Sequence, residues 1–361
     1  MKVLITGGAG FIGTHLAAAL RGRGHPVSIF DNYDPQVHGR VKGKKKQSVL
    51  DSPALKRAVN RADAVVHFAA AVGVGQSQYQ IKHYVDTNIG GTANLLEILA
   101  SRKKPLKKLL VAGSMSAYGE GAYLCRKCGR VRPVLRTPAV VRGKRWDPAC
   151  PNCAGALRPT GTSEKDPFIC SSIYAVTKMT QEELVMNYGT AYGVATTALR
   201  FFNVYGPGQS LSNPYTGVAA IFMSRIKNGQ PPGIFEDGGQ TRDFISVHDI
   251  VQACMLSLTR KAANNRVFNV GTGKATSVLE LAERLVRIFG ASVKPKTFGT
   301  FRKGDIRHCY ADNALICDVL GFKPRVDLDS GMRELIEWAH GVRAVDTFEK
   351  AHRELKERKL A

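Results

Sequence analysis

Apolar and polar positions follow strand and helix patterns in alternation along the chain. Short apolar runs predict buried strands at 3–5, 27–30, 64–68, 109–112, 195–202 and 266–270. Apolar residues at helical spacing predict helices at 14–23, 54–60, 88–100, 174–189 and 278–289, whereas 32–47 has no period and is expected to be an exposed loop. Strands that alternate with helices are typical of parallel β-α-β units, so the pattern predicts an α/β fold with a doubly wound parallel sheet.

The alternation breaks at 121–159 and again after residue 203, and these breaks predict the domains. Residues 1–203 are expected to form a dinucleotide-binding Rossmann domain with an insert at 121–160. Residues 204–240 and 291–361 are expected to form a smaller C-terminal α/β domain that binds the substrate. The segment 241–290 is expected to rejoin the first domain.

The segment VLITGGAGFIG at 3–13 carries the first candidate site. Gly7, Gly10 and Gly13 follow the first strand at a spacing of three, a variant of the dinucleotide fingerprint. Such glycines allow a tight turn, close approach of a pyrophosphate and packing of the next helix, whose free N–H groups suit phosphate. Asp31 ends the second strand, where an acid binds a ribose 2′-hydroxyl and would repel the 2′-phosphate of NADP. The stretch therefore predicts NAD as the cofactor.

The apolar content and the net charge limit which kinds of protein the chain can be. The chain has 361 residues, 44% of them apolar, and a formal net charge of +23. No apolar run reaches the roughly 18 residues of a membrane span. Because the chain begins directly with a strand, we expect a cytoplasmic protein without a signal peptide. The charge indicates polyanionic partners, either nucleic acid or phosphorylated small molecules, and is equally compatible with a solvated basic surface.

Tyr174 and Lys178 lie four residues apart in YAVTK, so on a helix both face the same side. A free tyrosine has a pKa near 10, which is too high for a base at neutral pH. A lysine ammonium one turn away, together with an oxidised nicotinamide ring, would favour the phenolate. Ser114 ends a predicted strand of the same nucleotide fold. These three residues are the candidate catalytic set, with Ser116 as the alternative to Ser114.

Two cysteine pairs, Cys125/Cys128 and Cys150/Cys153, are separated by 21 residues of the insert. Four thiolates at this spacing are typical of a structural zinc site with no open coordination position. The insert also holds nine Lys and Arg residues against one acid, Asp147. A nucleic-acid-binding or sensor protein is therefore the non-enzymatic alternative. Because the insert lies between the predicted catalytic residues along the chain, it is expected to cover or border the substrate pocket.

Further strings give the chain a family resemblance over nearly its whole length. They are HFAAAVGVGQS at 67–77, SMSAYG at 114–119, RFFNVYGPGQ at 200–209, TRDFISVHD at 241–249 and RKGDIRHCYAD at 302–312. With TGGAGFIG and YAVTK, the chain resembles the extended short-chain dehydrogenase/reductases and, within them, the nucleotide-sugar epimerases. The resemblance implies that Ser114 hydrogen-bonds a sugar hydroxyl, that Tyr174 is the base and acid, and that Lys178 also holds the nicotinamide ribose.

The same resemblance implies which residues contact the ligands. The cofactor set is Gly7, Gly10, Phe11, Ile12, Gly13, Asp31, Asn32, Val49, Phe68, Ala69, Ala70, Asn88, Tyr174 and Lys178. The nucleotide-sugar set is Ser116, Asn203, Asn213, Arg242, Arg302 and Asp305, in which the two arginines would clamp the diphosphate. Relatives usually carry an acid at the adenine edge, where this chain has Ser48 and Val49.

The end of the strand at 109–114 discriminates among reactions. Sugar dehydratases carry an Asp-Glu pair after a threonine there, and decarboxylases carry a glutamate, whereas this chain has no carboxylate until Glu120. A second general acid is therefore missing. The resemblance then implies epimerisation at one carbon: the hydroxyl is oxidised, the bound keto sugar turns over, and NAD is regenerated in place.

The cysteine insert and SLSNPYTGV at 210–218 look like a subgroup of dTDP-L-rhamnose 4-epimerases. Epimerases of UDP-glucose/galactose or UDP-uronate, and a nucleotide 4-keto-sugar reductase, are the alternatives. The resemblance also implies a homodimer formed through the helices at 88–100 and 174–189.

Overall fold

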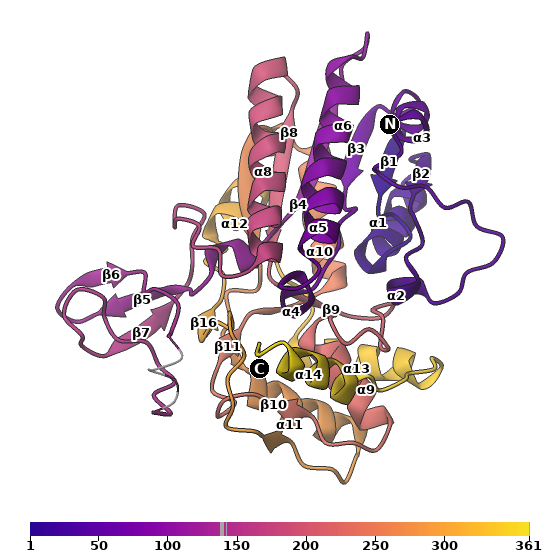
Figure 1. Cartoon of the computed structure of the whole chain (residues 1–361). Helices are drawn as coiled ribbons and strands as arrows, with labels where there is room; N and C mark the ends of the chain where they lie inside the picture. Colours follow the sequence, from indigo (N-terminus) through magenta and orange to yellow (C-terminus); the bar gives the residue numbers. More distant parts are fainter. Residues whose placement is uncertain (138–140, 142, 361) are drawn as a thin grey trace.

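Six parallel strands form the central sheet, in the order β13-β8-β4-β3-β1-β2. A computed structural model describes residues 1–137, 141 and 143–360 (Figure 1). The strands are β1 (Val3–Thr6), β2 (Val27–Phe30), β3 (Ala64–His67), β4 (Lys108–Ser114), β8 (Thr196–Phe201) and β13 (Arg266–Val270). The order reverses beside β1, and ligands of such sheets bind at the carboxyl ends of the strands near that point.

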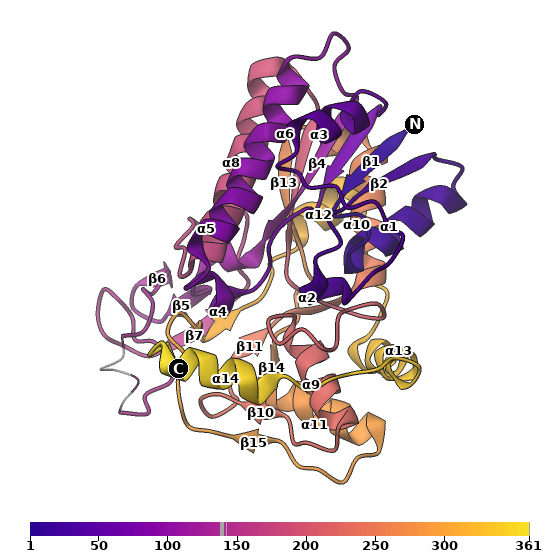
Figure 2. The ribbon, with the colours of Figure 1, turned by 45° about the vertical axis from the view of Figure 1, so that its right-hand side comes forward.

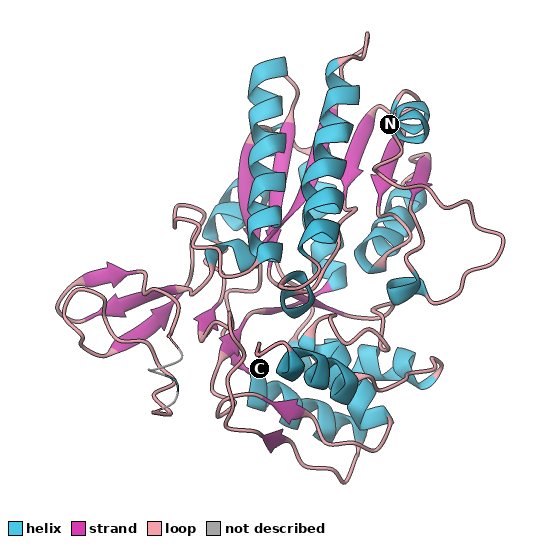
Figure 3. Ribbon diagram, viewed as in Figure 1, coloured by secondary structure: helices cyan, strands magenta, loops and turns pink. Residues whose placement is uncertain are grey.

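Helices cover both faces of this sheet, as Figure 3 shows. One face packs against α1 (Phe11–Gly22), α10 (Val247–Thr259) and α12 (Ala314–Leu320), whose apolar residues share one core with the strands. The other face packs against α3 (Ser52–Val59), α6 (Gly91–Ala100) and α8 (Ile173–Tyr192) through a second core. The predicted doubly wound α/β fold is confirmed.

A second lobe has its own apolar core, shared by α9 (Val218–Lys227), α11 (Val278–Phe289) and α13 (Leu328–His340). The segment 241–290 therefore rejoins the sheet only in part. Its α10 and β13 pack with the sheet, but α11 packs against α9 and α13 of the second lobe. An amphipathic helix has one apolar face whichever core receives it, so its sequence pattern does not choose between them.

Short elements complete the second lobe and the connections. Paired strands are β9 (Asn203–Tyr205) with β12 (Phe244–Ser246), β10 (Gly233–Ile234) with β15 (Lys296–Thr297), and β11 (Thr241–Arg242) with β14 (Thr276–Ser277) and β16 (His308–Cys309). Short helices are α2 (Pro35–His38), α4 (Val74–Ser77), α5 (Ile81–Tyr84), η1 (Val85–Gly90), η2 (Met115–Tyr118) and η3 (Lys261–Ala263). The last helix, α14 (Phe348–Glu357), lies against the second lobe near the interlobe side (Figure 2).

Four local predictions need correction. Helix α1 begins at Phe11 rather than at 14, because Gly10 caps it without a side-chain bond and the turn leads straight into it. The expected loop at 32–47 contains α2, which Asp34 caps and Pro35 starts. The helix predicted from 88 is preceded by the π-helical turn η1. Helix α8 extends beyond 189 to Tyr192, and Gly193 caps it with a left-handed φ of 64°.

The insert forms a small antiparallel sheet of β5 (Ala122–Cys125), β6 (Gly129–Val131) and β7 (Leu157–Thr160). Figure 1 shows these strands projecting from the body of the molecule, at the left. Among the described residues, no helix is both long and apolar enough to cross a bilayer.

Candidate active site

The glycine turn after β1 is shaped for close backbone approach. Gly7 has a φ of 67°, and a Cβ there would lie 2.7 Å from the backbone nitrogen of Ala69. A Cβ at Gly13 would lie 2.6 Å from the carbonyl oxygen of Gly7. Gly10 caps α1 without a side chain, which leaves the first helical N–H groups open to a phosphate. This cradle, which side chains would fill, fits a dinucleotide.

Asp31 lies at the end of β2 and faces the glycine turn. Its carboxylate accepts hydrogen bonds from the backbone N–H of Ala9, at 2.9 Å, and of Tyr33, at 2.8 Å. Only 7% of the residue is exposed. A negative charge fixed beside the turn is compatible with ribose hydroxyls and repels an extra phosphate, so the site fits NAD better than NADP.

The other residues of the predicted cofactor set surround the same edge of the sheet. Phe11 and Ile12 start α1, Asn32 follows Asp31 and is exposed, and Phe68, Ala69 and Ala70 form the loop after β3. The fully buried Asn88 binds this loop, since its side chain pairs with both backbone groups of Ala71. Val49 differs: its side chain is buried against Gly91 in a core of the sheet, and its carbonyl accepts from the Asn94 side chain at 2.6 Å.

Ser114 and Tyr174 come together at the carboxyl end of β4. Burial raises the pKa of Tyr174, and the hydrogen bond from the Ser114 hydroxyl opposes this rise. The Ser116 hydroxyl lies 2.8 Å from that of Ser114. The backbone N–H of Tyr174 donates to the Ser77 hydroxyl at 3.0 Å, which fixes the start of α8 beside α4. The arrangement places a hydroxyl pair and a phenol side by side.

Lys178 lies one turn further along α8 and is almost fully buried, at 4% exposure. Burial lowers its pKa to about 8, and the charge of Glu182 opposes the drop. Its ammonium donates to the side-chain oxygen of Gln181. In this structure the hydrogen bond with Ser114 is the interaction that lowers the pKa of Tyr174, against the effect of burial.

Gln181 belongs to a buried polar network that reaches the cofactor edge. Its amide nitrogen lies 2.9 Å from the Thr92 hydroxyl and 3.4 Å from the carbonyl of Ala69. The His67 ring lies 2.7 Å from the Thr6 hydroxyl through Nδ1 and 2.9 Å from the Thr92 hydroxyl through Nε2. Burial, with Lys178 nearby, lowers the pKa of His67 to about 3, so the ring is neutral.

The Thr92 contacts define the direction of three hydrogen bonds, and with the proton on His67 Nε2 the Gln181 nitrogen 3.2 Å from that atom does not donate to it. The Thr92 hydroxyl donates to the carbonyl of Asn88 at 2.6 Å, so it accepts from both His67 and Gln181. His67 then carries its proton on Nε2 and accepts from Thr6 at Nδ1. Gln181 must direct its oxygen to Lys178, because an ammonium only donates. The network therefore links the ends of β1 and β3 to Lys178.

An ion pair lies behind the catalytic residues. Glu182 and Arg200 are buried and their side chains approach to 2.6 Å. Arg200 also donates to the Tyr118 hydroxyl, and its guanidinium lies 4.3 Å from the ring centre of Phe168. The pair joins α8 to β8 and stabilises the position of the helix that carries Tyr174.

The two predicted phosphate-binding arginines lie on the second lobe. Arg242 donates to the carbonyls of Ile306, at 2.7 Å, and Arg307, at 3.0 Å. Arg302 pairs with Asp305 at 2.8 Å, and its guanidinium lies 4.5 Å from the ring centre of Phe235. Both are thus attached to the segment 302–308, and the Arg302 side chain keeps 40% of its surface exposed.

The predicted substrate-binding amides differ in their bonding. The side-chain oxygen of Asn203 is buried and has no hydrogen-bond partner among the described residues, as expected of a group that a ligand completes. Asn213 accepts from the backbone N–H of Tyr215, at 3.0 Å, and from Gln36, at 3.3 Å.

Glu120, the first carboxylate after β4, is buried at 1% exposure and fully occupied. It accepts from the backbone N–H groups of Arg307 and His308, each at 2.8 Å, and from the Tyr123 hydroxyl, at 2.5 Å. All of these donors belong to the protein, and they occupy both carboxylate oxygens. Glu120 is therefore a structural acceptor.

The four cysteines of the insert come together as a group. Their sulfur atoms all lie within 4.8 Å of one another, and all four thiols are free. The Cys125 and Cys153 sulfurs are 3.6 Å apart, close to the roughly 3.8 Å edge of a zinc–thiolate tetrahedron with bonds of about 2.3 Å. Backbone N–H groups of Cys128 and Lys127 lower the pKa of Cys125 to about 7. The donor set fits a tetrahedral zinc ion.

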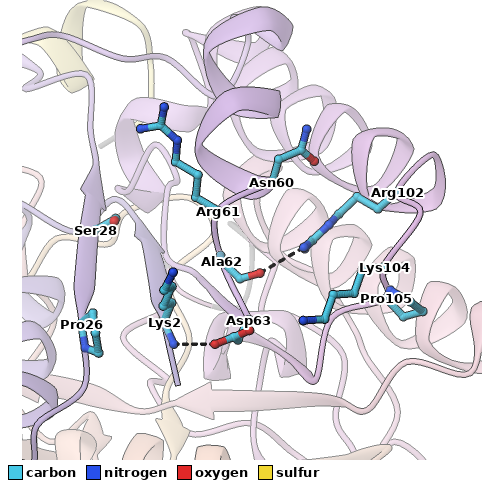
Figure 4. A pocket seen from close by; sticks show the side chains of 10 residues that line it. All are labelled: Lys2, Pro26, Ser28, Asn60, Arg61, Ala62, Asp63, Arg102, Lys104 and Pro105. Carbon is cyan, nitrogen blue, oxygen red and sulfur yellow. Dashed lines mark hydrogen bonds between the residues drawn. The ribbon is translucent and has the colours of Figure 1, made fainter.

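A cavity at the opposite edge of the sheet has no part in this site. Figure 4 shows its lining, which includes Lys2, Pro26 and Asp63, residues that immediately precede β1, β2 and β3. Ligands of doubly wound sheets bind at the carboxyl ends of the strands, whereas this cavity opens at their amino ends.

Comparison with known proteins identifies the family. The model of the NAD dependent epimerase/dehydratase family matches residues 3–133 and 151–271. The chain belongs to this family. The predicted resemblance is confirmed, and the family model leaves out 134–150, which is most of the segment between the two cysteine pairs together with Cys150.

Individual relatives within the family cover almost the whole chain. A dTDP-L-rhamnose 4-epimerase of Burkholderia thailandensis is 32% identical, over 93% of this chain and 94% of its own length. The crystal structure of a UDP-glucose 4-epimerase from Thermotoga maritima with UDP-glucose has a TM-score of 0.78 at 30% identity, covering 94% of this chain and 99% of its own. A UDP-glucuronic acid 4-epimerase from Bacillus cereus, solved with UDP-glucuronic acid and NAD, has a TM-score of 0.77 at 25% identity, covering 95% and 100%.

The sequence patterns missed the buried network behind Lys178. Thr6, His67 and Thr92 are spread over two strands and a helix, and each fits the apolar or neutral pattern of its own segment. Helical spacing could have identified Gln181, because it lies three residues after Lys178 on the same face of the helix.

Proposed function

We propose that the protein catalyses NAD-dependent epimerisation at C4 of a nucleotide-diphosphate sugar through a transient 4-keto sugar. The observation that carries this proposal is the end of β4, where Ser114 meets Tyr174 while the nearest following carboxylate, Glu120, is occupied by three donors. Dehydration or decarboxylation would require a free acid at this place.

Each residue has a role in the proposed reaction. Tyr174 takes the proton of the C4 hydroxyl and later returns it, and Ser114 orients that hydroxyl through its own. Lys178, held by Gln181, supplies a positive charge that favours the phenolate once its ammonium faces Tyr174. The cradle of Gly7, Gly10 and Gly13, with Asp31, would hold NAD, which when bound accepts and returns the two electrons and hydrogen of the C4 carbon.

Our preferred substrate is dTDP-L-rhamnose. The relative from Burkholderia thailandensis acts on this class of sugar by its name, and the strings at 210–218 and the cysteine insert resemble the same subgroup. UDP-glucose/galactose and UDP-uronates are the alternatives, and relatives with those names are nearly as similar. A nucleotide 4-keto-sugar reductase is a further alternative.

We also propose that the four cysteines bind one structural zinc ion. The compact group of sulfurs and the N–H donors to Cys125 support this. A hydrogen bond to Cys153 and burial raise the pKa of the Cys128 thiol to about 12, and a divalent cation would displace the thiol proton.

Incubation of the purified protein with dTDP-L-rhamnose, UDP-glucose and UDP-glucuronate tests the function. We expect inversion at C4 of one of them without added cofactor, and loss of that turnover in Tyr174→Phe. Stoichiometric consumption of added reduced cofactor would indicate a reductase. Salt-sensitive RNA binding with no turnover of any nucleotide sugar would support the non-enzymatic alternative.

A further inference from the structure

The loop between the two cysteine pairs docks onto the second lobe, next to the two phosphate-binding arginines. The strands β5, β6 and β7 project outward from the body of the molecule (Figure 1). Two described residues between the cysteine pairs, Arg136 and Asp147, contact the body of the molecule. Both residues lie in 134–150, which the family model does not cover.

Arg136 makes the central contact. Its guanidinium forms a two-pronged pair with Glu236, at 2.8 and 2.9 Å, and both side chains are only 1% exposed. It also donates to the carbonyls of Trp146, at 2.8 Å, and Asp305, at 3.3 Å. A buried two-pronged pair of this kind fixes orientation as well as distance.

Asp147 makes the second contact, from the other end of the loop. Its carboxylate lies 2.8 Å from Arg307 Nε, and Arg307 in turn binds Glu236 at 3.0 Å and Asp237 at 2.6 Å. Arg136 and Arg307 therefore share Glu236. The loop is joined to 235–237 and to 305–307 through one connected set of charges.

These two segments carry the groups that hold the arginine clamp. The carbonyls of Ile306 and Arg307 accept from Arg242. Asp305 pairs with Arg302, whose guanidinium stacks on the ring of Phe235. Arg136 of the insert thus contacts Asp305, which pairs with Arg302. It also contacts Glu236, which pairs with Arg307, whose carbonyl accepts from Arg242.

We propose that Arg136 and Asp147 are positioning residues of the diphosphate clamp, and that the cysteine cluster serves to fix the loop that carries them. This inference rests on the proposed function, since it assumes that Arg242 and Arg302 bind a nucleotide diphosphate. Cys128 and Cys150 hold the two ends of this loop together in the cysteine cluster. The loop therefore has less conformational freedom to lose when it binds the second lobe. Without Arg136, Glu236 keeps only its ion pair with Arg307, and the carbonyl of Asp305 loses its hydrogen bond from Arg136.

The test compares Arg136→Met with Arg136→Lys, Asp147→Asn and a control, Arg126→Met. Arg126 is exposed on the same insert, so its substitution removes the same charge without a buried contact. Affinity for UDP and for dTDP alone is measured by calorimetry, with zinc and NAD content determined on each protein. Steady-state kcat and KM are measured with the sugar that the wild type turns over.

We expect Arg136→Met to weaken diphosphate binding and raise KM at least 10-fold, with kcat within about 2-fold of the wild type and NAD retained. Arg136→Lys should recover part of the loss, Asp147→Asn should show a smaller loss, and Arg126→Met none. Removal of zinc from the wild type should weaken UDP or dTDP binding as Arg136→Met does, while bound NAD stays.

Unchanged affinity and KM in folded Arg136→Met and Asp147→Asn overturn the inference while the proposed function stands. An equal loss in Arg126→Met also overturns it, because general charge is then the cause. If Arg136→Met does not fold, Arg136→Lys and Asp147→Asn decide by the same measurements. A wild type that binds neither nucleotide and turns over no nucleotide sugar refutes the proposed function itself.

Discussion

Gln181 accepts a hydrogen bond from the Lys178 ammonium, so we expect it to stabilise that charge, and two substitutions of nearly equal size test this in opposite directions. Gln181→Met removes the acceptor of the ammonium, whereas Gln181→Glu places a carboxylate against it. Lys178 is buried, and its pKa is already lowered from 10.5 to about 8, which corresponds to roughly 3 kcal/mol of lost stabilisation of the charged form. A residue this close to neutrality responds strongly to one hydrogen bond.

A hydrogen bond to a charged group contributes about 1.5–3 kcal/mol. At about 1.36 kcal/mol per pKa unit, its loss in Gln181→Met would lower the pKa of Lys178 by roughly one to two further units. Catalysis needs the ammonium, so activity is lost as pH rises through this pKa. The basic limb of kcat should lie near pH 8 in the wild type, move down by about one to two units in Gln181→Met and move up in Gln181→Glu.

The assay is kcat against pH from about 5.5 to 10, with the sugar that the wild type turns over. Asn187→Asp is the control, because it adds a carboxylate at an exposed position of the same helix. Its profile should match the wild type. Identical basic limbs in the wild type and both Gln181 variants would refute the reasoning, as would a shift of both variants in the same direction.

Four further outcomes follow from the site and its supports. Gly10→Val should remove bound NAD and activity together, because side-chain atoms would enter the phosphate cradle, and cofactor absorbance after purification checks this. Cys150→Ser should lower zinc content from one per chain, measured by metal analysis against the wild type. The pKa of His67 is about 3 in the folded protein and near 6.5 in the unfolded chain, so the protein loses stability as the pH drops below 6.5. Between pH 7 and pH 5, the free energy of unfolding of His67→Asn should therefore fall by about 2 kcal/mol less than that of the wild type, as measured by urea unfolding. Glu182→Gln should reduce the free energy of unfolding by about 3 kcal/mol, because Arg200 would remain buried without its counter-charge, and the double variant with Arg200→Met should recover part of it.

Local signals in the sequence were sufficient for the sheet and for much of the candidate site. The apolar runs predicted the six strands, and the spacing of Gly7, Gly10 and Gly13 predicted the turn that the structure forms. The four cysteines come together as their spacing indicated. In each case the physical cause acts within a few residues, or through a metal-ligand spacing, and so leaves a pattern in the sequence.

Contacts between distant segments were beyond such patterns. Arg136 and Glu236 are 100 positions apart and Arg307 is 160 from Asp147, so their pairing follows from the fold and not from local spacing. The expected return of 241–290 to the first domain failed at α11 for the same reason. The role of His67 stayed hidden because its strand is apolar on both sides, and only the three-dimensional structure brings Thr6 and Thr92 to its ring.

The way the chain passes between the two cores bears on how the protein can move. It runs from β8 into the second lobe, returns through α10 and β13, leaves again for α11, returns in α12 and passes back to the second lobe with α13 and α14. The chain therefore crosses the boundary between the two lobes several times. Rotation of one lobe about a single hinge would require all of these crossings to change their backbone angles together, which is far harder than bending one linker. Exchange of substrate is thus expected to depend on movements of side chains and loops, and small-angle scattering should show nearly the same dimensions with and without a nucleotide sugar.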